Sequence, residues 1–237
     1  MRIRLFKDSR LRHPATETRC IMQITIREPG SALTHFIGLL LTLFASVPLL
    51  IKTGICTRGK SFPAMVVFAV SMILLYGAST IYHSVNLSGK ALRIFQKLDH
   101  MMIFVLIAGS YTPVCLIVLG DKSGYTLLGL VWGIAFVGML IKAFWITCPK
   151  WFSSIIYIAM GWVCLFVFRE LLNSLSPAAF VWLLTGGIIY TIGGIIYALR
   201  LPVFNTRHKA FGSHEIFHLF VMAGSFCHFV FMYCYVV

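Results

Sequence analysis

The sequence has few charged residues and very few acidic ones. Of its 237 residues, 11% are charged and only seven are Asp or Glu, whereas 59% are hydrophobic. A soluble domain averages about a quarter charged residues, so this composition excludes an ordinary soluble enzyme. The seven cysteines scatter along the chain and form no C-x-x-C pair, a pattern that supports neither a disulfide framework nor a thiolate metal site.

What the sequence has instead is long apolar runs without charge. Each approaches or reaches the roughly 17–25 residues that cross a bilayer as a helix. We therefore expect an all-α integral membrane protein, with a seven-helix bundle over residues 28–237 and a basic N-terminal arm at 1–27. The runs cover residues 31–51, 61–82, 101–119, 125–141, 151–168, 177–199 and 216–237.

The net charge of +13 raises the question of nucleic acid, but its distribution favours a membrane explanation. If the N-terminus is cytoplasmic, fifteen of the 20 Lys and Arg lie in cytoplasmic segments and five on the other side. Such an excess is the positive-inside signal. We expect a multi-pass protein of the cell membrane with its N-terminus inside and C-terminus outside, whose partner is membrane lipid.

The helix at 177–199 contains a direct repeat of Gly-Gly-Ile-Ile-Tyr, beginning at Gly186 and again at Gly193. The seven-residue spacing keeps the small residues on one helix face. Such a face predicts close packing against a neighbouring helix.

Polar and ionisable residues at membrane depth are costly and mark candidate functional sites. In the expected topology they gather at the cytoplasmic leaflet, whereas the opposite ends offer mainly Asp121 and Glu170. The cytoplasmic set is Glu28 and His35 before and in the first helix, Ser79 and His83 at the end of the second, Asp99 at the start of the third, and His214, Glu215 and His218 at the start of the seventh.

The spacing within this set is typical of a metal site. His214 and His218 are four residues apart and project from one helix face, as Ser79 and His83 do. Three neutral imidazoles and a water make a tetrahedral zinc site with an open position, and Asp99 is available to accept a hydrogen bond from that water. The alternative is that these histidines lie at the interface and bond to headgroups or loop carbonyls.

Residues 214–218 read His-Glu-Ile-Phe-His, which also matches the H-E-x-x-H motif of zinc proteases, with Glu215 as general base. An intramembrane protease of that kind would need a later aspartate as third ligand. No acidic residue follows Glu215, and Asp99 precedes the motif. The protease is therefore the weaker interpretation.

Taken together, the motifs resemble the haemolysin-III-like family of the progestin and adiponectin receptor superfamily, which is distantly similar to alkaline ceramidases. The resemblance covers residues 28–237, and the short loops and first motif look more like the bacterial branch, which implies a bacterial inner membrane. The matching stretches are Glu28-x-x-Ser31-x-x-Thr34-His35-x-x-Gly38, Ser79-Thr80-Ile81-Tyr82-His83, Lys97-Leu98-Asp99-His100, Ala108-Gly109-Ser110-Tyr111-Thr112-Pro113, and His214-Glu215-Ile216-Phe217-His218 with Gly224-Ser225 and His228-Phe229.

The resemblance implies a zinc ion held by His83, His214 and His218, with Asp99 and Ser79 contacting the zinc-bound water. Glu215 would orient a ligand or the loop rather than bind the metal. Three further histidines match family positions without an assigned role: His35, His100 and His228.

Two functions of different class follow. The first is a zinc-dependent hydrolase of a lipid amide or ester, with Asp99 as general base and Ser79 stabilising the oxyanion. The second is a non-catalytic protein of the haemolysin type, which senses lipid or forms a pore as a homo-oligomer. No helix interior carries the ring of charge typical of a selectivity filter.

Overall fold

The computed structural model describes residues 26–57, 61–199 and 212–237, and every regular element in these ranges is a helix. Seven helical segments in them are long and apolar enough to cross a membrane. The all-α prediction is confirmed, while most of the predicted arm at 1–27 lies outside the described residues. The segments are α1 (Pro29–Cys56), α2 (Phe62–Ser84), α3 (Gly89–Pro113) with the π-helical η1 (Val114–Leu119), α4 (Lys122–Phe144), α5 (Lys150–Gly161) with η2 (Val163–Val167) and α6 (Phe168–Ser174), α7 (Pro177–Leu199), and α9 (Ser213–Phe231) with η3 (Met232–Val236).

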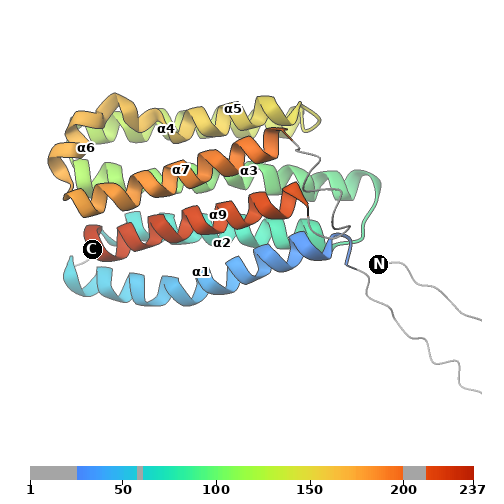
Figure 1. Cartoon of the computed structure of the whole chain (residues 1–237), viewed down its shortest axis with the longest axis horizontal. Coiled ribbons are helices and arrows are strands. Elements are labelled where there is room, and N and C mark those ends of the chain that lie inside the picture. The colour runs from blue at the N-terminus through green and yellow to red at the C-terminus, as the bar shows by residue number, and fades with distance from the viewer. Residues whose placement is uncertain (1–25, 58–60, 200–211) are drawn as a thin grey trace, which may run out of the picture.

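The helices form one elongated bundle (Figure 1). Helix α2 packs on α1 and α3, and α9 packs on α7 and α1, whereas α4 and α5 lie on the side away from α1. Helices α1 and α9 begin at the same end of the bundle, and the C-terminus lies at the other end. We call the end where α9 begins the histidine end.

The bundle carries large apolar side chains on its outer surface as well as in its core. Phe68, Phe104 and Phe231 are fully buried, whereas Phe44 and Phe144 are 75% and 87% exposed. Exposure of such a surface to water is unfavourable, whereas lipid tails solvate it. Each helix satisfies its own backbone hydrogen-bonding groups, as a bilayer requires. The exposed apolar surface is therefore the lipid-facing surface.

The third helix is longer than its apolar run predicts. It begins at Gly89 and not at residue 101, because Lys90, Arg93 and Lys97 end the uncharged run without ending the helix. Hydropathy reports which residues can enter lipid, while helix formation continues past the membrane boundary. The prediction that Asp99 lies at the start of this helix is consequently wrong: Asp99 lies well inside α3.

The glycine repeat brings α7 close to α9, as the sequence predicts. A Cβ at Gly193 would lie 2.7 Å from Cβ of Phe220, and one at Gly186 would lie 2.5 Å from Cδ2 of the His228 ring. A Cβ at Gly187, by contrast, would have no atom within 4 Å. One face of α7 is therefore kept small so that α9 can pack against it.

Candidate metal centre

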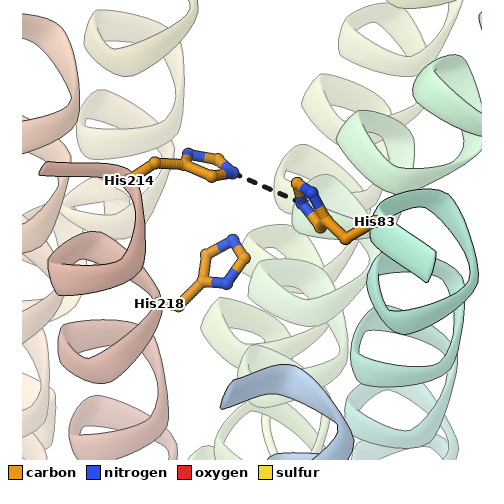
Figure 2. A group of neighbouring side chains, drawn as sticks. All are labelled: His83, His214 and His218. Atoms are coloured by element: carbon orange, nitrogen blue, oxygen red, sulfur yellow. Dashed lines mark hydrogen bonds between the residues drawn. The ribbon is translucent and has the colours of Figure 1, made fainter. Parts of the chain in front are cut away.

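Three of the predicted site histidines meet at the histidine end. His83 comes from the last turn of α2, and His214 and His218 from the first turns of α9. Each offers a ring nitrogen, and the three nitrogens lie within 4.8 Å of one another. Figure 2 shows the rings converging from two helices on a common space.

The distances suit a small tetrahedral cation. Nε2 of His214 lies 3.3 Å from Nε2 of His83. Two ligands at the ~2.0–2.1 Å that zinc prefers, separated by a tetrahedral angle, would lie about 3.3 Å apart. His83 and His218 are almost fully buried. The group can hold a metal ion.

A carboxylate fixes the orientation of the His83 ring. Nδ1 of His83 lies 2.5 Å from Oε2 of Glu28, just before α1. This hydrogen bond is the main cause that lowers the pKa of Glu28 from 4.5 to about 2, so Glu28 is ionised at neutral pH and accepts the Nδ1 proton. The Nε2 lone pair of His83 is then left facing the other two rings, as in a carboxylate–histidine–metal arrangement.

The hydroxyl of Thr34 fixes the orientation of the His218 ring. Thr34 Oγ1 donates its proton to the carbonyl of Ser31 at 2.9 Å and lies 3.1 Å from Nδ1 of His218. Because its proton is already used, the threonine oxygen accepts from the His218 Nδ1–H. That tautomer leaves Nε2 of His218 with a lone pair that is able to bind a metal ion.

Within the described ranges, Glu215 makes no hydrogen bond to a histidine ring. Its carboxylate accepts from the hydroxyl of Ser31 on α1 and, at 2.8 Å, from the backbone N–H of Gly212. It thus ties the start of α9 to α1 and completes the N-terminal cap of α9. Glu215 positions the helix that carries His214 and His218.

His35 belongs to the same cluster. Its ring stacks on that of His218 at 3.5 Å between centroids, and neither of its nitrogens has a hydrogen-bond partner among the described residues. Sequence reasoning assigned no role to His35, Glu28 or Thr34. The spacing of these residues in the sequence could have indicated their role. Glu28, Ser31 and Thr34–His35 recur every three to four residues, so they share one face of α1.

Asp99 and Ser79 lie with His214 and His218 around one cavity. The Ser79 side chain is 1% exposed, and its Oγ has no hydrogen-bond partner within the described ranges. Asp99 lies 3.5 Å from Nδ1 of His100 and makes no direct bond to the three clustered histidines in the part of the chain that the structure describes. Both side chains therefore line the cavity with His214 and His218, without a direct hydrogen bond to them among the described residues.

The cavity continues from this polar end along the inside of the bundle. His214 and His228 both line it, and fourteen residues of helix separate them, which is about 21 Å. This exceeds the roughly 15 Å of one bilayer leaflet. Most of the wall is apolar, from α3, α5, α7 and α9, including Ile103, Leu106, Ile107, Ile158, Leu183, Leu184 and Val221.

Of the other described histidines, His100 lies beside Asp99, and its Nδ1 is 2.8 Å from the carbonyl oxygen of Gln96. His228 lies far along the cavity from the three histidines, stacked on Tyr190 at 5.3 Å. It has no hydrogen-bond partner among the described residues. It does not join the metal centre.

Comparison with known proteins identifies the family. The family model described as haemolysin-III related matches residues 23–229. This chain belongs to the haemolysin-III-related family. Hemolysin-3 of Bacillus cereus is 37% identical over 86% of this chain and 89% of its own length. The Hemolysin-3 homolog of Bacillus subtilis (strain 168) is 38% identical over 89% of this chain and 96% of its own length.

The haemolysin-III-related chain also has more distant relatives. The adiponectin receptor protein of Drosophila melanogaster is 23% identical over 85% of this chain, which spans 49% of that receptor. The predicted resemblance to the receptor superfamily is thereby confirmed. With seven spanning segments and these bacterial relatives, the protein is a multi-pass membrane protein.

Proposed function

We propose that the protein is a zinc-dependent hydrolase that cleaves a lipid amide or ester. One observation carries the proposal: the cavity that passes His214, His218, Asp99 and Ser79 continues as an apolar channel about as long as an acyl chain. A polar group of a lipid would meet the polar residues at the histidine end while its chain fills the rest. Cavities of this kind, apolar with a few convergent polar groups, are typical of ligand sites.

His83, His214 and His218 would hold the zinc through their Nε2 atoms, in the orientation set by Glu28 and Thr34. When bound, zinc supplies a Lewis acid that lowers the pKa of a coordinated water and polarises a substrate carbonyl. The carboxylate of Asp99 would accept the proton of the attacking water and later return it to the leaving group. The unpartnered hydroxyl of Ser79 would donate to the oxygen on which negative charge develops.

The decisive experiment measures fatty acid released from a panel of acyl amides and acyl esters, with metal content determined on the same samples. We expect Asp99→Asn to keep its metal and lose about 10²–10⁴-fold of the rate. Ser79→Ala should lose up to about 10²–10³-fold. Asp121→Asn, at the opposite end of the bundle, is the matched control. A zinc-loaded wild type that releases no fatty acid from any lipid would refute the hydrolase.

The second candidate is a non-catalytic, lytic role, and it rests on the name of the relative in Bacillus cereus, Hemolysin-3. A homo-oligomer would have to form the pore, with its contacts made by the lipid-facing surface. Dye release from protein-containing vesicles tests this role. Release that is unchanged in Asp99→Asn, without any fatty acid product, would favour it over the hydrolase.

We further propose that the histidine end faces the cytoplasm, in a bacterial inner membrane. The positive-inside distribution supports this orientation. Cys56 and Cys234 are exposed at the ends of α1 and η3, opposite the histidine end. A membrane-impermeant thiol reagent should therefore label them in intact cells whose outer barrier has been removed. Labelling only after lysis would reverse the orientation.

A further inference from the structure

A second cavity opens at the histidine end, beside the first. Its volume is about 290 Å³. Its wall comes from α3, α4, the α4–α5 connection, α5 and α7. The polar lining residues, which we call the basic pocket, are Gln96, His100, Lys142, Thr147, Cys148, Lys150, Ser153 and Tyr197.

Lys142 is the unusual member of the basic pocket, because its side chain is only 3% exposed. Its ammonium donates to Oγ of Ser153 at 2.5 Å and to Sγ of Cys148 at 3.1 Å, both neutral groups in their ordinary state. A buried ammonium is costly unless it is paired with an anion. The described residues bring no carboxylate within ion-pair distance of Lys142.

The chain has few carboxylates that could serve. Among the described ones, three already have partners at the histidine end and two lie at the opposite end of the bundle. The only others in the sequence lie outside the described residues. The three at the histidine end are Glu28, Asp99 and Glu215, the two at the opposite end are Asp121 and Glu170, and the two outside the described residues are Asp8 and Glu17.

Other features add positive potential to the same pocket. Lys150, at the first position of α5, lies with Nζ 4.4 Å from the centre of the Tyr197 ring. The N-cap residue of α5, Pro149, provides no side-chain cap to the first N–H groups of the helix. Helix N-termini attract anions, so α5 and both lysines favour the same kind of ligand.

The basic pocket adjoins the long cavity. His100 and Tyr197 line both, and the Tyr197 ring lies 5.8 Å from that of His214. Asp99, next to His100, is at the same junction. A ligand with an anion in the basic pocket and an acyl chain in the long cavity would place the linkage between them at the three histidines.

We propose that the basic pocket binds the phosphate of an amphipathic lipid, which makes the substrate class an acyl lipid with a phosphate headgroup. Lysine is a common point-charge ligand of phosphate, and anionic lipids are enriched in the cytoplasmic leaflet. The position of the bond to be cleaved rests on the proposed hydrolase. The binding of phosphate by the basic pocket does not.

The test compares two lipids that differ only in the phosphate, monooleoylglycerol and monooleoylglycerol 3-phosphate, with inorganic phosphate as a third probe. Binding to the metal-loaded wild type is measured in a phosphate-free, non-ionic detergent. We expect the phosphate lipid to bind about tenfold or more tightly than the neutral lipid, as loss of charged hydrogen bonds implies. Inorganic phosphate should bind far more weakly, because it lacks the chain.

Lys142→Met should abolish this preference while leaving the affinity for monooleoylglycerol unchanged. Lys122→Met, which removes an exposed lysine at the opposite end, is the charge-matched control and should keep it. Lys150→Gln alters a half-buried side chain and should reduce the preference in part, which keeps the test valid if Lys142→Met does not fold. Metal content and melting temperature report the folding of each variant.

Three outcomes would overturn the proposal: equal affinity of the wild type for the two lipids, a preference that survives Lys142→Met or is undiminished in Lys150→Gln, or inorganic phosphate binding as tightly as the phosphate lipid. The last would assign the pocket to free phosphate. Failure of the hydrolase is distinguishable, because it would leave the binding preference intact. Equal binding and cleavage of the two lipids would instead keep the hydrolase and refute the headgroup site.

Discussion

The two ends of the bundle use similar polar residues in different ways. At the end opposite the histidines, Asp121 accepts from the backbone N–H of Gly124 at 3.0 Å and caps α4, and Lys52 donates to the carbonyl of Tyr233 at 2.5 Å. At the histidine end, Glu28 bonds to a histidine of α2 and Thr34 to a histidine of α9. Asp121 and Lys52 complete helix termini at the first end, whereas Glu28 and Thr34 at the second orient side chains of other helices.

This difference separates structural polar residues from candidate functional ones better than residue type does. A cap needs only the backbone of its own helix. A metal site needs ring nitrogens aimed from several helices, and their orientation requires partners on the far side of each ring. Four substitutions, in order of decreasing expected effect, test this difference between the two ends.

The first is His218→Ala, which removes one of three ring nitrogens from the centre. We expect metal content to fall from about one ion per chain to below about 0.1, because two imidazoles do not make a stable zinc site. His228→Ala, a histidine of the same helix outside the cluster, should keep the ion. Mass spectrometry of the purified proteins measures both. Equal metal loss in the two variants would mean that the ion binds elsewhere.

The second is Glu28→Gln, which keeps an acceptor for His83 but removes its charge. Mutation of the partner that orients a metal-binding histidine reduces metal affinity about 10–100-fold. Glu170→Gln changes an acidic residue of α6 at the opposite end and should leave the affinity as it is. Competition with a chelator of known affinity provides the measurement. An unchanged affinity in Glu28→Gln would reduce the Glu28–His83 bond to a structural contact.

The third is Thr34→Val, which leaves Nδ1 of His218 without its acceptor. We expect a loss of metal affinity of about tenfold or less, since the lost bond is between neutral groups. Thr126→Val removes a hydroxyl that bonds only to the carbonyl of Lys122 in its own helix, and it should have no effect on metal. The same chelator competition applies, and equal behaviour of the two variants would count against the assigned tautomer.

The smallest effect is expected from Asp121→Ala, which removes the cap of α4. Hydrogen bonds from Ser123 and Gly124 lower the pKa of Asp121 below its ordinary 3.8. Its stabilising contribution is therefore present above that pH and is lost as the pH falls below it. We expect a small drop in melting temperature at neutral pH that disappears on acidification, with metal content unchanged. A drop that is equally large at low pH would assign the effect to something other than the carboxylate.

Much of the fold could be predicted from the sequence, because a bilayer imposes a minimum length on every apolar run. The runs at 177–199 and 61–82 correspond closely to α7 and α2. The errors lie where charge and helicity diverge: Lys90, Arg93 and Lys97 ended the predicted run but continue α3. Hydropathy indicates whether a residue favours lipid or water, whereas helix formation depends on backbone hydrogen bonds that charged residues also allow.

The candidate site could be predicted in part. His214 and His218 share a helix face, and the charge distribution placed His83 at the same end of the bundle. The three clustered histidines could therefore be predicted from the sequence. Glu28, Thr34 and His35 were missed as partners because their contacts join α1 to α2 and α9. The spacing shows that they share a face of α1, but the helix they face depends on packing.

From the sequence alone one can predict how many helices cross the membrane, where the apolar runs end, and which end of the bundle gathers imidazoles and carboxylates. Bilayer thickness and the cost of charge in lipid decide these features residue by residue. The packing of the helices is needed to know which apolar residues line the long cavity, which ring nitrogens remain free, and that Lys142 is buried. The sequence pattern of an apolar side chain is the same whether it faces lipid or a cavity, and a lysine near a helix end is expected to be exposed. Neighbouring helices determine what covers each side chain, and the sequence does not show how they pack.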